Sequence, residues 1–159
     1  IMKFNKAIKN LFIVLFSTLL ISACSTAKKS VDTVDDVYTG TDTVEFLAKG
    51  VPDRIFFATN KSKLTTASRD TLRKQATWMR KNKDVTVTVE GHADERGTRE
   101  YNLALGERRA NAAKDYLMTY GVSGKRISVI SYGKERPVNP ASSPLAWSQN
   151  RRSVTVKAN

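Results

Sequence analysis

The stretch VTVTVEGHADERGTREYNLALGERRANAAKDYLMTYG, residues 85–121, predicts a strand, a loop and a long helix in succession. In residues 85–91 valine alternates with threonine or glutamate, and this period of two with β-branched residues indicates a half-buried strand. Residues 99–120 repeat apolar side chains at helical spacing, and Gly121 ends the run. A strand followed by a helix is the unit from which α/β folds are built.

Three more strands, one more helix and a helical turn are predicted around this unit. They fall at 54–58 (RIFFA, strand), about 65–82 (helix), 126–133 (RISVISYG, strand), 145–149 (turn) and 151–158 (RRSVTVKA, strand). Thr65 or Thr66 is expected to cap the helix, because a hydroxyl before a helical run accepts from its free N–H groups. The order βαβαβ(α)β predicts an α/β fold, a two-layer sandwich with helices packed on a mixed four-stranded sheet.

The first 23 residues are expected to be removed as a lipoprotein signal peptide. Lysines precede an apolar run at 11–20 that is interrupted only by Ser17 and Thr18, and small residues follow it. This order of charged, apolar and small residues is typical of an export signal. The run is well short of the ~20 residues that span a bilayer, so a permanent transmembrane helix is the weaker alternative.

Cys24 is the only cysteine of the chain and directly follows the small residues. It has no disulfide partner within the chain, and Ile21-Ser22-Ala23-Cys24 resembles the lipobox at which bacterial lipoproteins are cleaved and acylated. A free thiol beside an ordinary cleavage site is the alternative. Residues 24–50 are rich in serine, threonine, aspartate and lysine, so we expect an acylated cysteine followed by a flexible tether. The folded domain is then expected over residues 51–159.

The net charge favours an anionic partner or surface. The chain carries 27 basic and 15 acidic residues, a net charge of +12. Removing residues 1–23 takes away three lysines and no acid, which leaves 24 against 15, or +9. A solubilising role of these spread charges is the alternative. Nucleic acid is excluded as a partner, because an export signal separates the protein from it and no zinc-finger spacing, ribonucleoprotein motif or long basic arm is present.

The helix predicted at 99–120 carries an arginine on its apolar side. On a wheel of about 100° per residue, Arg109 projects between two rows of apolar residues, whereas Arg108 falls on the polar face. An unpaired charge among apolar side chains is very costly, so Arg109 needs an anion or a row of carbonyl groups. It either pairs with an internal carboxylate, lies along the domain edge with its head in water, or binds an anionic ligand.

The loop before this helix favours the ligand. Two glycines, His92, Asp94 and Glu95 crowd the end of a predicted strand. Loops at the carboxyl ends of strands are where α/β proteins bind their ligands. Asp94 offers an acceptor for an ammonium group, and Arg109 offers a planar fork for a carboxylate. The two residues together predict a site for a zwitterionic ligand.

The same residues do not suggest catalysis. His92 is the only histidine and Cys24 is assigned to the anchor, so no set of nitrogen and sulfur ligands for zinc can be completed. Asp94 and Glu95 are adjacent carboxylates without an activated nucleophile nearby. GERRAN, residues 106–111, lacks the spacing of a phosphate-binding loop. We therefore expect no enzyme activity, no metal and no cofactor.

Four separated motifs resemble one family. GHADERGTREYNLALGERRANAAKDYL (91–117), with RIFFATNKSKLT (54–65), SYGKERP (131–137) and NRRSV (150–154), is similar to the family that shares the C-terminal domain of outer-membrane protein A. The likeness extends over residues 51–157, and the lipobox and tether match the lipoprotein branch. It implies an OmpA-like domain that binds the diaminopimelate-containing stem peptide of peptidoglycan without a covalent bond.

The resemblance also implies site residues. In the family, the residues matching Asp94 and Arg109 engage the amino-acid end of diaminopimelate, and the loop after the first strand forms a wall of the pocket. Many members have Phe-Asp-x-Asp in that loop, whereas this chain has Phe57-Ala58-Thr59-Asn60, so Asn60 lacks the usual charge. The remaining residues expected to line or support the pocket are Phe57, Thr59, Tyr101, Leu105 and Arg152.

The implied function is structural. The resemblance implies a lipoprotein anchored on the periplasmic face of the outer membrane, which tethers that membrane to the cell wall. It also implies partnership with the Tol system in envelope integrity and cell division, notably with TolB. A cell-wall hydrolase would need a nucleophile or a metal, and a motor stator of the same family would need a true transmembrane helix.

Overall fold

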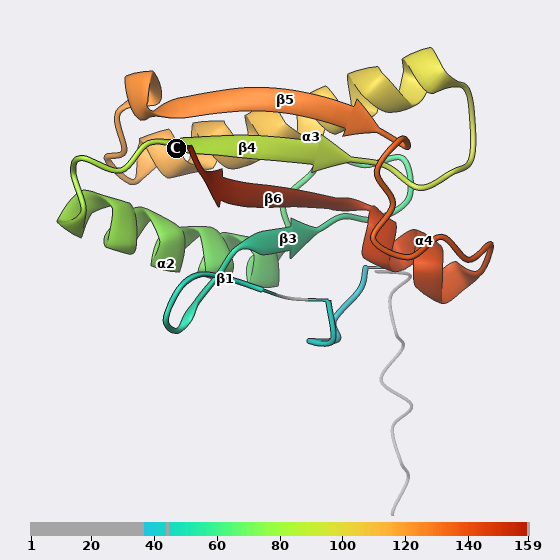
Figure 1. Ribbon diagram of the computed structural model, residues 1–159, viewed down its shortest axis with the longest axis horizontal. Coiled ribbons are helices and arrows are strands. Elements are labelled where there is room, and N and C mark those ends of the chain that lie inside the picture. The colour runs from blue at the N-terminus through green and yellow to red at the C-terminus, as the bar shows by residue number, and fades with distance from the viewer. Residues whose placement is uncertain (1–36, 44, 159) are drawn as a thin grey trace, which may run out of the picture. The chain divides into compact units, whose positions relative to one another are not determined.

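The computed structural model describes residues 37–43 and 45–158 (Figure 1). The expected signal peptide and Cys24 lie outside the described residues. The elements in chain order are β1 (Phe46–Ala48), β2 (Val51–Pro52), β3 (Arg54–Phe56), α2 (Thr66–Lys81), β4 (Val87–His92), α3 (Arg99–Thr119), the 3-10 turn η1 (Gly124–Arg126), β5 (Ile127–Gly133), α4 (Pro144–Asn150) and β6 (Arg152–Lys157).

The main sheet has the strand order β3-β6-β4-β5. Strands β4 and β5 are parallel, and β6 is antiparallel to both β3 and β4, so the sheet is mixed. Helices α2 and α3 lie together on one face of it (Figure 1). The predicted two-layer α/β fold with a mixed four-stranded sheet is confirmed.

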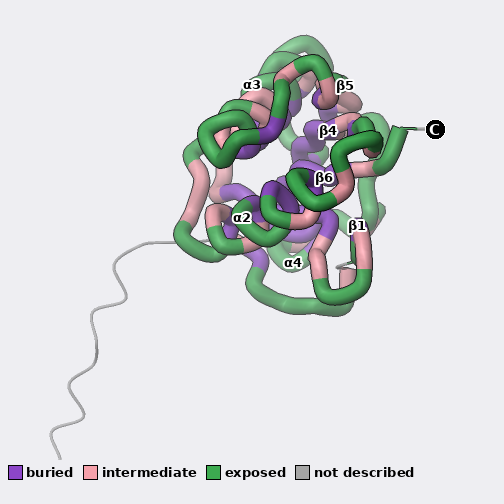
Figure 2. Tube along the Cα trace, turned by 90° about the vertical axis from the view of Figure 1, so that its left-hand side faces the viewer, coloured by how far each residue is buried: buried purple, intermediate pink, exposed green. Residues whose placement is uncertain are grey.

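The core lies between the sheet and these two helices, where the buried segments of the trace gather (Figure 2). The strands contribute alternate residues to it, because successive side chains point to opposite faces of a sheet. Its fully buried members include Val89, Leu72, Met79 and Leu117. The valine alternation in the quoted stretch therefore marks the face of β4 that packs on the helices.

Both long helices begin at a threonine cap. The Thr65 side chain accepts a hydrogen bond from the Ser68 N–H, and that of Thr98 accepts one from the Tyr101 N–H. Each cap satisfies one of the N–H groups that a helix leaves unpaired in its first turn. Gly121, with a φ of 83°, follows the end of α3. The predicted ends of both helices are thus confirmed to within a residue or so.

Strand β4 and helix α3 approach each other at a pair of glycines. A Cβ atom built on Gly91 would lie 1.8 Å from the carbonyl oxygen of Gly106. Only two residues without side chains allow the two backbones to come this close. This contact sets the end of β4 directly against α3, on the turn that precedes Arg109.

Residues 37–50, which the sequence places in the tether, include structured segments. Strand β1 pairs with β2, and the Asp53 N–H donates to the Glu45 carbonyl at 2.9 Å. The Tyr38 ring is buried against Phe56, with ring centroids 4.8 Å apart. Order thus begins before Val51. The sequence gives little sign of this, because a three-residue strand among polar residues has no measurable period.

Candidate ligand-binding site at the carboxyl ends of the strands

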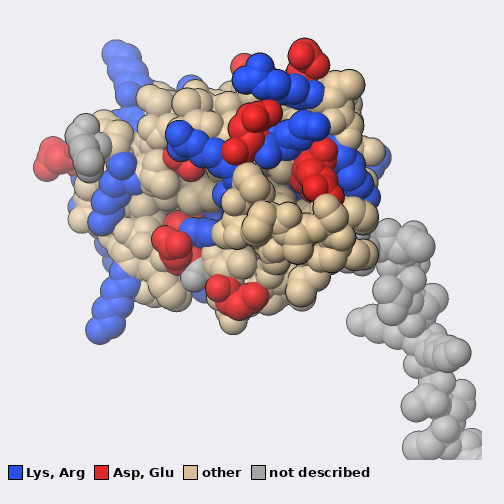
Figure 3. Space-filling model, turned by 45° about the vertical axis from the view of Figure 1, so that its right-hand side comes forward, with Lys and Arg blue, Asp and Glu red and all other residues tan. Residues whose placement is uncertain are grey.

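The ends of all four strands of the main sheet that border the candidate site lie at one edge of the sheet. Strands β3, β4 and β5 run in the same direction, so their carboxyl ends lie together, beside the start of β6 (Figure 1). Basic and acidic side chains alternate on the surface in the view that brings this side of the molecule forward (Figure 3). In α/β sheets, ligands bind in the crevice outside such ends.

Arg109 lies at the centre of this region and is completely buried. Its Nε donates to the Lys61 carbonyl at 2.9 Å, Nη1 to the His92 carbonyl at 2.8 Å and Nη2 to the Ala58 carbonyl at 3.0 Å. Its guanidinium also lies 5.2 Å from the centre of the Phe57 ring. The sequence predicts that Arg109 meets an anion or a row of carbonyl groups on its buried side. The structure shows the row of carbonyl groups. Arg108 is exposed, as the helical wheel predicts.

These contacts make Arg109 part of the fold. They connect α3 to two separate segments, the loop after β3 and the end of β4. Alanine at this position would leave three carbonyl groups without their donor, and each lost buried partner costs ~1–3 kcal/mol. We therefore expect Arg109→Ala to lower the stability of the domain, so binding assays on that variant alone cannot isolate a role in ligand binding.

Asp94 is also buried, in the loop that follows β4. Its Oδ1 accepts from the backbone N–H and the Nε of Arg96 at 3.1 and 3.0 Å. Its Oδ2 accepts from Arg96 Nη2 at 2.7 Å and faces Arg151 Nη1 at 3.4 Å. Burial opposes the ionised form, but the hydrogen bonds and charge of Arg96, helped by Arg151, outweigh it and lower the pKa of the carboxyl. Asp94 is therefore ionised, with the guanidinium groups of Arg96 and Arg151 around it.

A second layer of contacts holds Arg96 in place. Its guanidinium lies 4.3 Å from the centre of the Trp147 ring, and its Nη2 is 3.3 Å from Thr59 Oγ1. The Trp147 indole donates to Glu95 Oε1 at 2.8 Å, and Ser142 Oγ lies 3.0 Å from the other oxygen of that carboxylate. Helix α4 and the loops after β3 and β4 are thereby joined around one arginine.

The other predicted site residues divide into two groups. Phe57 is buried against the Arg109 guanidinium, Leu105 is buried about one helical turn before Arg109, and Thr59 contacts Arg96. Asn60 and Tyr101 lie outside this buried group. Asn60 is exposed and has a φ of 56°, in a turn that the Lys61 N–H closes on the Ala58 carbonyl at 3.1 Å.

That backbone conformation gives a reason for the departure at Asn60. Asparagine tolerates positive φ better than most residues, and it is favoured at the third position of such turns. Tyr101 is 43% exposed in the first turn of α3, with the Arg108 guanidinium 6.0 Å from its ring centre. It lies at the rim of the region.

The structure does not bring Arg152 to Asp94. Arg152 points from β6 to the sheet face opposite the helices, where its Nη2 donates to the Arg136 carbonyl at 3.2 Å. Burial, then the charge of Arg54, lowers its pKa to about 10. Its neighbour Arg151 takes the place beside Asp94 and donates from Nε to the Phe57 carbonyl at 3.0 Å. Successive side chains at the start of β6 point to opposite faces of the sheet, so the two adjacent arginines lie on opposite sides of it.

His92 is buried on that same opposite face. Neither ring nitrogen makes a hydrogen bond to another described residue, and Nε2 lies 3.6 Å from Glu90 Oε2. Burial, followed by the positive charges of Arg152, Arg136 and Arg54, lowers its pKa to about 3. The ring is therefore neutral at ordinary pH.

Two residues of the site were missed from the sequence, namely Arg96 and Trp147. Arg96 and Trp147 are 51 positions apart, and no local period relates them. Arg151 stood in a matched motif, but only the direction of β6 decides which of two adjacent arginines faces Asp94.

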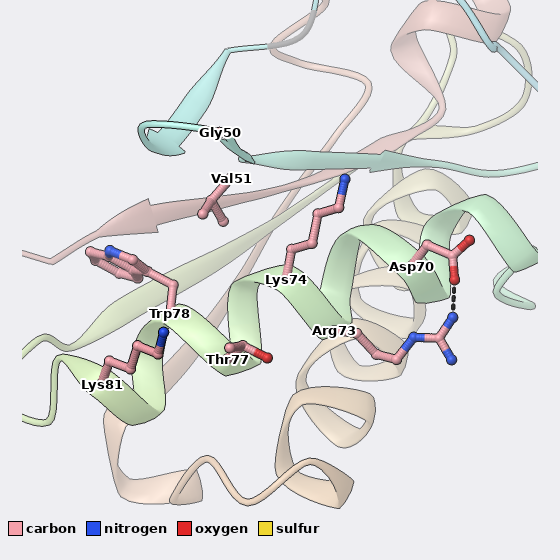
Figure 4. Close-up of a pocket in the computed structure, with 8 residues that line it drawn as sticks. All are labelled: Gly50, Val51, Asp70, Arg73, Lys74, Thr77, Trp78 and Lys81. Carbon is pink, nitrogen blue, oxygen red and sulfur yellow. Dashed lines mark hydrogen bonds and ion pairs between the residues drawn. The ribbon is translucent and has the colours of Figure 1, made fainter.

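An open groove lies elsewhere, between α2 and the β1–β2 turn (Figure 4). Its volume is about 740 Å³, and its walls include Trp78, Lys74, Lys81 and Val51. None of the predicted site residues lines it. In residues 37–43 and 45–158, no group of three or more histidine, cysteine, aspartate or glutamate side chains is arranged to hold a metal ion.

The chain is similar to one family model and to several known proteins of the same name. The model of the OmpA family matches residues 56–151. The peptidoglycan-associated lipoprotein of Brucella melitensis biotype 1 is 44% identical over 149 residues, which cover 91% of this chain and 89% of that protein. The protein of the same name from Rhizobium meliloti is 56% identical over 106 residues, covering 67% of this chain and 60% of that one.

Solved structures give the same picture of the fold. The crystal structure of the peptidoglycan-associated lipoprotein from Burkholderia pseudomallei matches with a TM-score of 0.65 at 32% identity, over 67% of this chain and 90% of that chain. The C-terminal domain of Helicobacter pylori MotB matches with a TM-score of 0.63 over 67% of this chain and 84% of that one. At 23% identity, the second likeness concerns the fold alone.

Proposed function

The chain belongs to the OmpA family, and from that premise we propose that it is an outer-membrane lipoprotein that binds peptidoglycan without a covalent bond. The ligand is the stem peptide, held through the zwitterionic end of its diaminopimelate residue. Asp94 receives the ammonium group and Arg109 the carboxylate. Phe57, Thr59 and Leu105 form the wall around them, with Asn60 and Tyr101 at the rim.

One observation carries this proposal. Asp94 and Arg109 are both buried at the carboxyl ends of the strands, and a short series of contacts connects them. Arg109 donates to the carbonyl of His92, two residues before Asp94, and Asp94 faces Arg151, which is bonded to Phe57. Opposite charges in one desolvated region suit a ligand that carries both charges itself. The names of the relatives from Brucella, Rhizobium and Burkholderia add independent support.

The anchor completes the proposal. Residues 1–23 would be removed as a signal peptide, Cys24 would be acylated, and the following residues would link the lipid to the domain. Several acyl chains on one residue bind a membrane firmly, because each buried CH₂ contributes ~0.8 kcal/mol. In the described part of the chain, no helix has the length and apolarity that a membrane span requires. A mature N-terminus whose mass shows no acyl chain would contradict this part.

The molecule would thus join outer membrane and cell wall at the periplasmic face. In the same proposal it serves the Tol–Pal system in envelope integrity and cell division, with TolB as a partner that competes for the wall-binding surface. Its action is binding and not catalysis. Release of soluble fragments from purified peptidoglycan would contradict this and favour a hydrolase.

Sedimentation with purified peptidoglycan tests the proposal. The full-length protein in detergent is expected to sediment with the sacculi, and free diaminopimelate is expected to release it. Arg109→Lys keeps the charge but cannot form two parallel hydrogen bonds to a carboxylate, so we expect it to reduce binding at least tenfold. Arg108→Ala removes the exposed neighbouring charge and is the matched control, with little expected loss.

Thermal melts of each variant show whether lost binding reflects lost fold. Equal loss of binding in Arg108→Ala and Arg109→Lys would refute the assignment of Arg109 to the ligand. Binding to sacculi that free diaminopimelate does not displace would also refute this assignment.

A further inference from the structure

The carboxylate proposed to receive the ligand's ammonium group is already engaged by an arginine of this chain. Arg96 donates to both oxygens of Asp94 through Nε at 3.0 Å and Nη2 at 2.7 Å, while its backbone N–H adds a third bond at 3.1 Å. A bidentate pair of this kind is among the stronger hydrogen-bonded ion pairs. An ammonium group cannot occupy the same oxygen positions while this guanidinium is there.

Of the two arginines beside Asp94, only Arg96 is able to leave. The Arg151 side chain is 2% exposed and is bonded to the Phe57 carbonyl, so it is fixed within the fold. The Arg96 side chain is 41% exposed and belongs to the loop between β4 and α3. Because its head already reaches solvent, Arg96 can turn into water without disturbing the core, and the contact with Asp94 is what it gives up.

A resting place for the displaced guanidinium is next to it. The Trp147 ring lies 4.3 Å away and is fixed by its hydrogen bond to Glu95. Stacking on an aromatic ring does not depend on the contact with Asp94. Arg96 can therefore turn away from the carboxylate and keep one of its contacts.

We propose that Arg96 is an internal competitor of the ligand, which closes the Asp94 site until an ammonium group displaces it. This inference rests on the proposed function, because it assumes that Asp94 is the ammonium acceptor. A ligand with an ammonium group alone must give up one ion pair to gain another. A ligand that also brings a carboxylate to Arg109 has a net gain, so Arg96 favours zwitterions over simple amines.

Removal of the competing charge tests the proposal. Arg96→Gln keeps a polar side chain and the backbone bond to Asp94 but loses the charge and the bidentate pair. In titrations of the full-length protein in detergent with a diaminopimelate-containing stem peptide, we expect it to bind roughly three- to tenfold more tightly than the parent. Arg96→Lys, which retains the charge as a single point, should fall between the two.

Two controls separate this effect from a general change of charge. Arg99→Gln removes a neighbouring exposed arginine that pairs with Glu135 at 3.3 Å, and we expect no gain in affinity. In an Asp94→Asn background, Arg96→Gln should also bring no gain, because the competition acts through that carboxylate. A gain of the same size in either control would overturn the proposal.

The outcomes also distinguish this inference from the function on which it rests. If the parent binds the peptide and Arg96→Gln binds it equally or more weakly, the competitor role is refuted and the proposed function stands. If the parent does not bind the peptide, or if Asp94→Asn binds as well as the parent, the assignment of the site fails and the competitor role fails with it.

Discussion

Arg109 binds three carbonyl oxygens from two segments of the chain, so its guanidinium fixes the loop after β3 against the end of β4. A helical wheel finds this residue because a charge on an apolar arc has to be compensated. The wheel cannot say by what, because carbonyl groups from distant segments carry no mark in the sequence. The same applies to Arg96, whose contacts with Asp94 and Trp147 combine a local and a distant partner.

His92 makes the stability of the domain depend on pH. Its pKa is about 3 in the folded protein, well below the ordinary value of about 6.5 that the unfolded chain has. Between these two values the unfolded chain binds the proton and the folded domain does not. The free energy of unfolding therefore falls as the pH falls from 6.5, by up to ~1.4 kcal/mol per pH unit.

Denaturant titrations at several pH values between 6.5 and 5 measure this slope above the range in which carboxylates titrate. His92→Gln has no ring to protonate, so its stability should change much less over the same range. Parallel curves for the two proteins would show that His92 is not the cause.

At the level of the elements, the site depends on the close approach of β4 and α3. A methyl group at Gly91 would meet the backbone oxygen of Gly106 at 1.8 Å, and backbone cannot move aside as a flexible side chain does. We expect Gly91→Ala to lower the free energy of unfolding by about 3 kcal/mol, the upper end of the ~1–3 kcal/mol that overpacking typically costs, because the obstructing atom is backbone.

Gly124→Ala is the control for that substitution. Its new methyl group would meet the Met118 side chain at 3.1 Å, and this flexible side chain can move. Urea denaturation should show a much smaller loss for this variant. Equal losses would mean that the contact between Gly91 and Gly106 is not special.

The elements also show which local signals suffice. The caps at Thr65 and Thr98 and the valine alternation of β4 are local, so the long helices and the main strands could be predicted. Strand β1 could not, because its three residues are stabilised by pairing with β2 and not by a pattern of their own. The direction of the Arg152 side chain could not be predicted for a similar reason, since it depends on the register of β6.

At the scale of the whole molecule, the fold gathers the ends of three strands and the start of a fourth around two buried residues of opposite charge, Asp94 and Arg109. The proposed ligand matches this arrangement because diaminopimelate carries an ammonium group and a carboxylate on one carbon. Lysine in the same position of a stem peptide offers the ammonium group without the carboxylate. The two peptides therefore differ in the carboxylate that is assigned to Arg109. Comparing them tests that assignment without any substitution in the protein.

Calorimetric titration of the full-length protein with these two stem peptides tests the central claim most directly. We predict that the diaminopimelate peptide binds at least tenfold more tightly than the lysine peptide, because only the former adds a carboxylate at Arg109, and hydrogen bonds between charged groups contribute ~1.5–3 kcal/mol. Equal affinities for the two peptides would contradict the account and would leave Arg109 with a role in the fold alone.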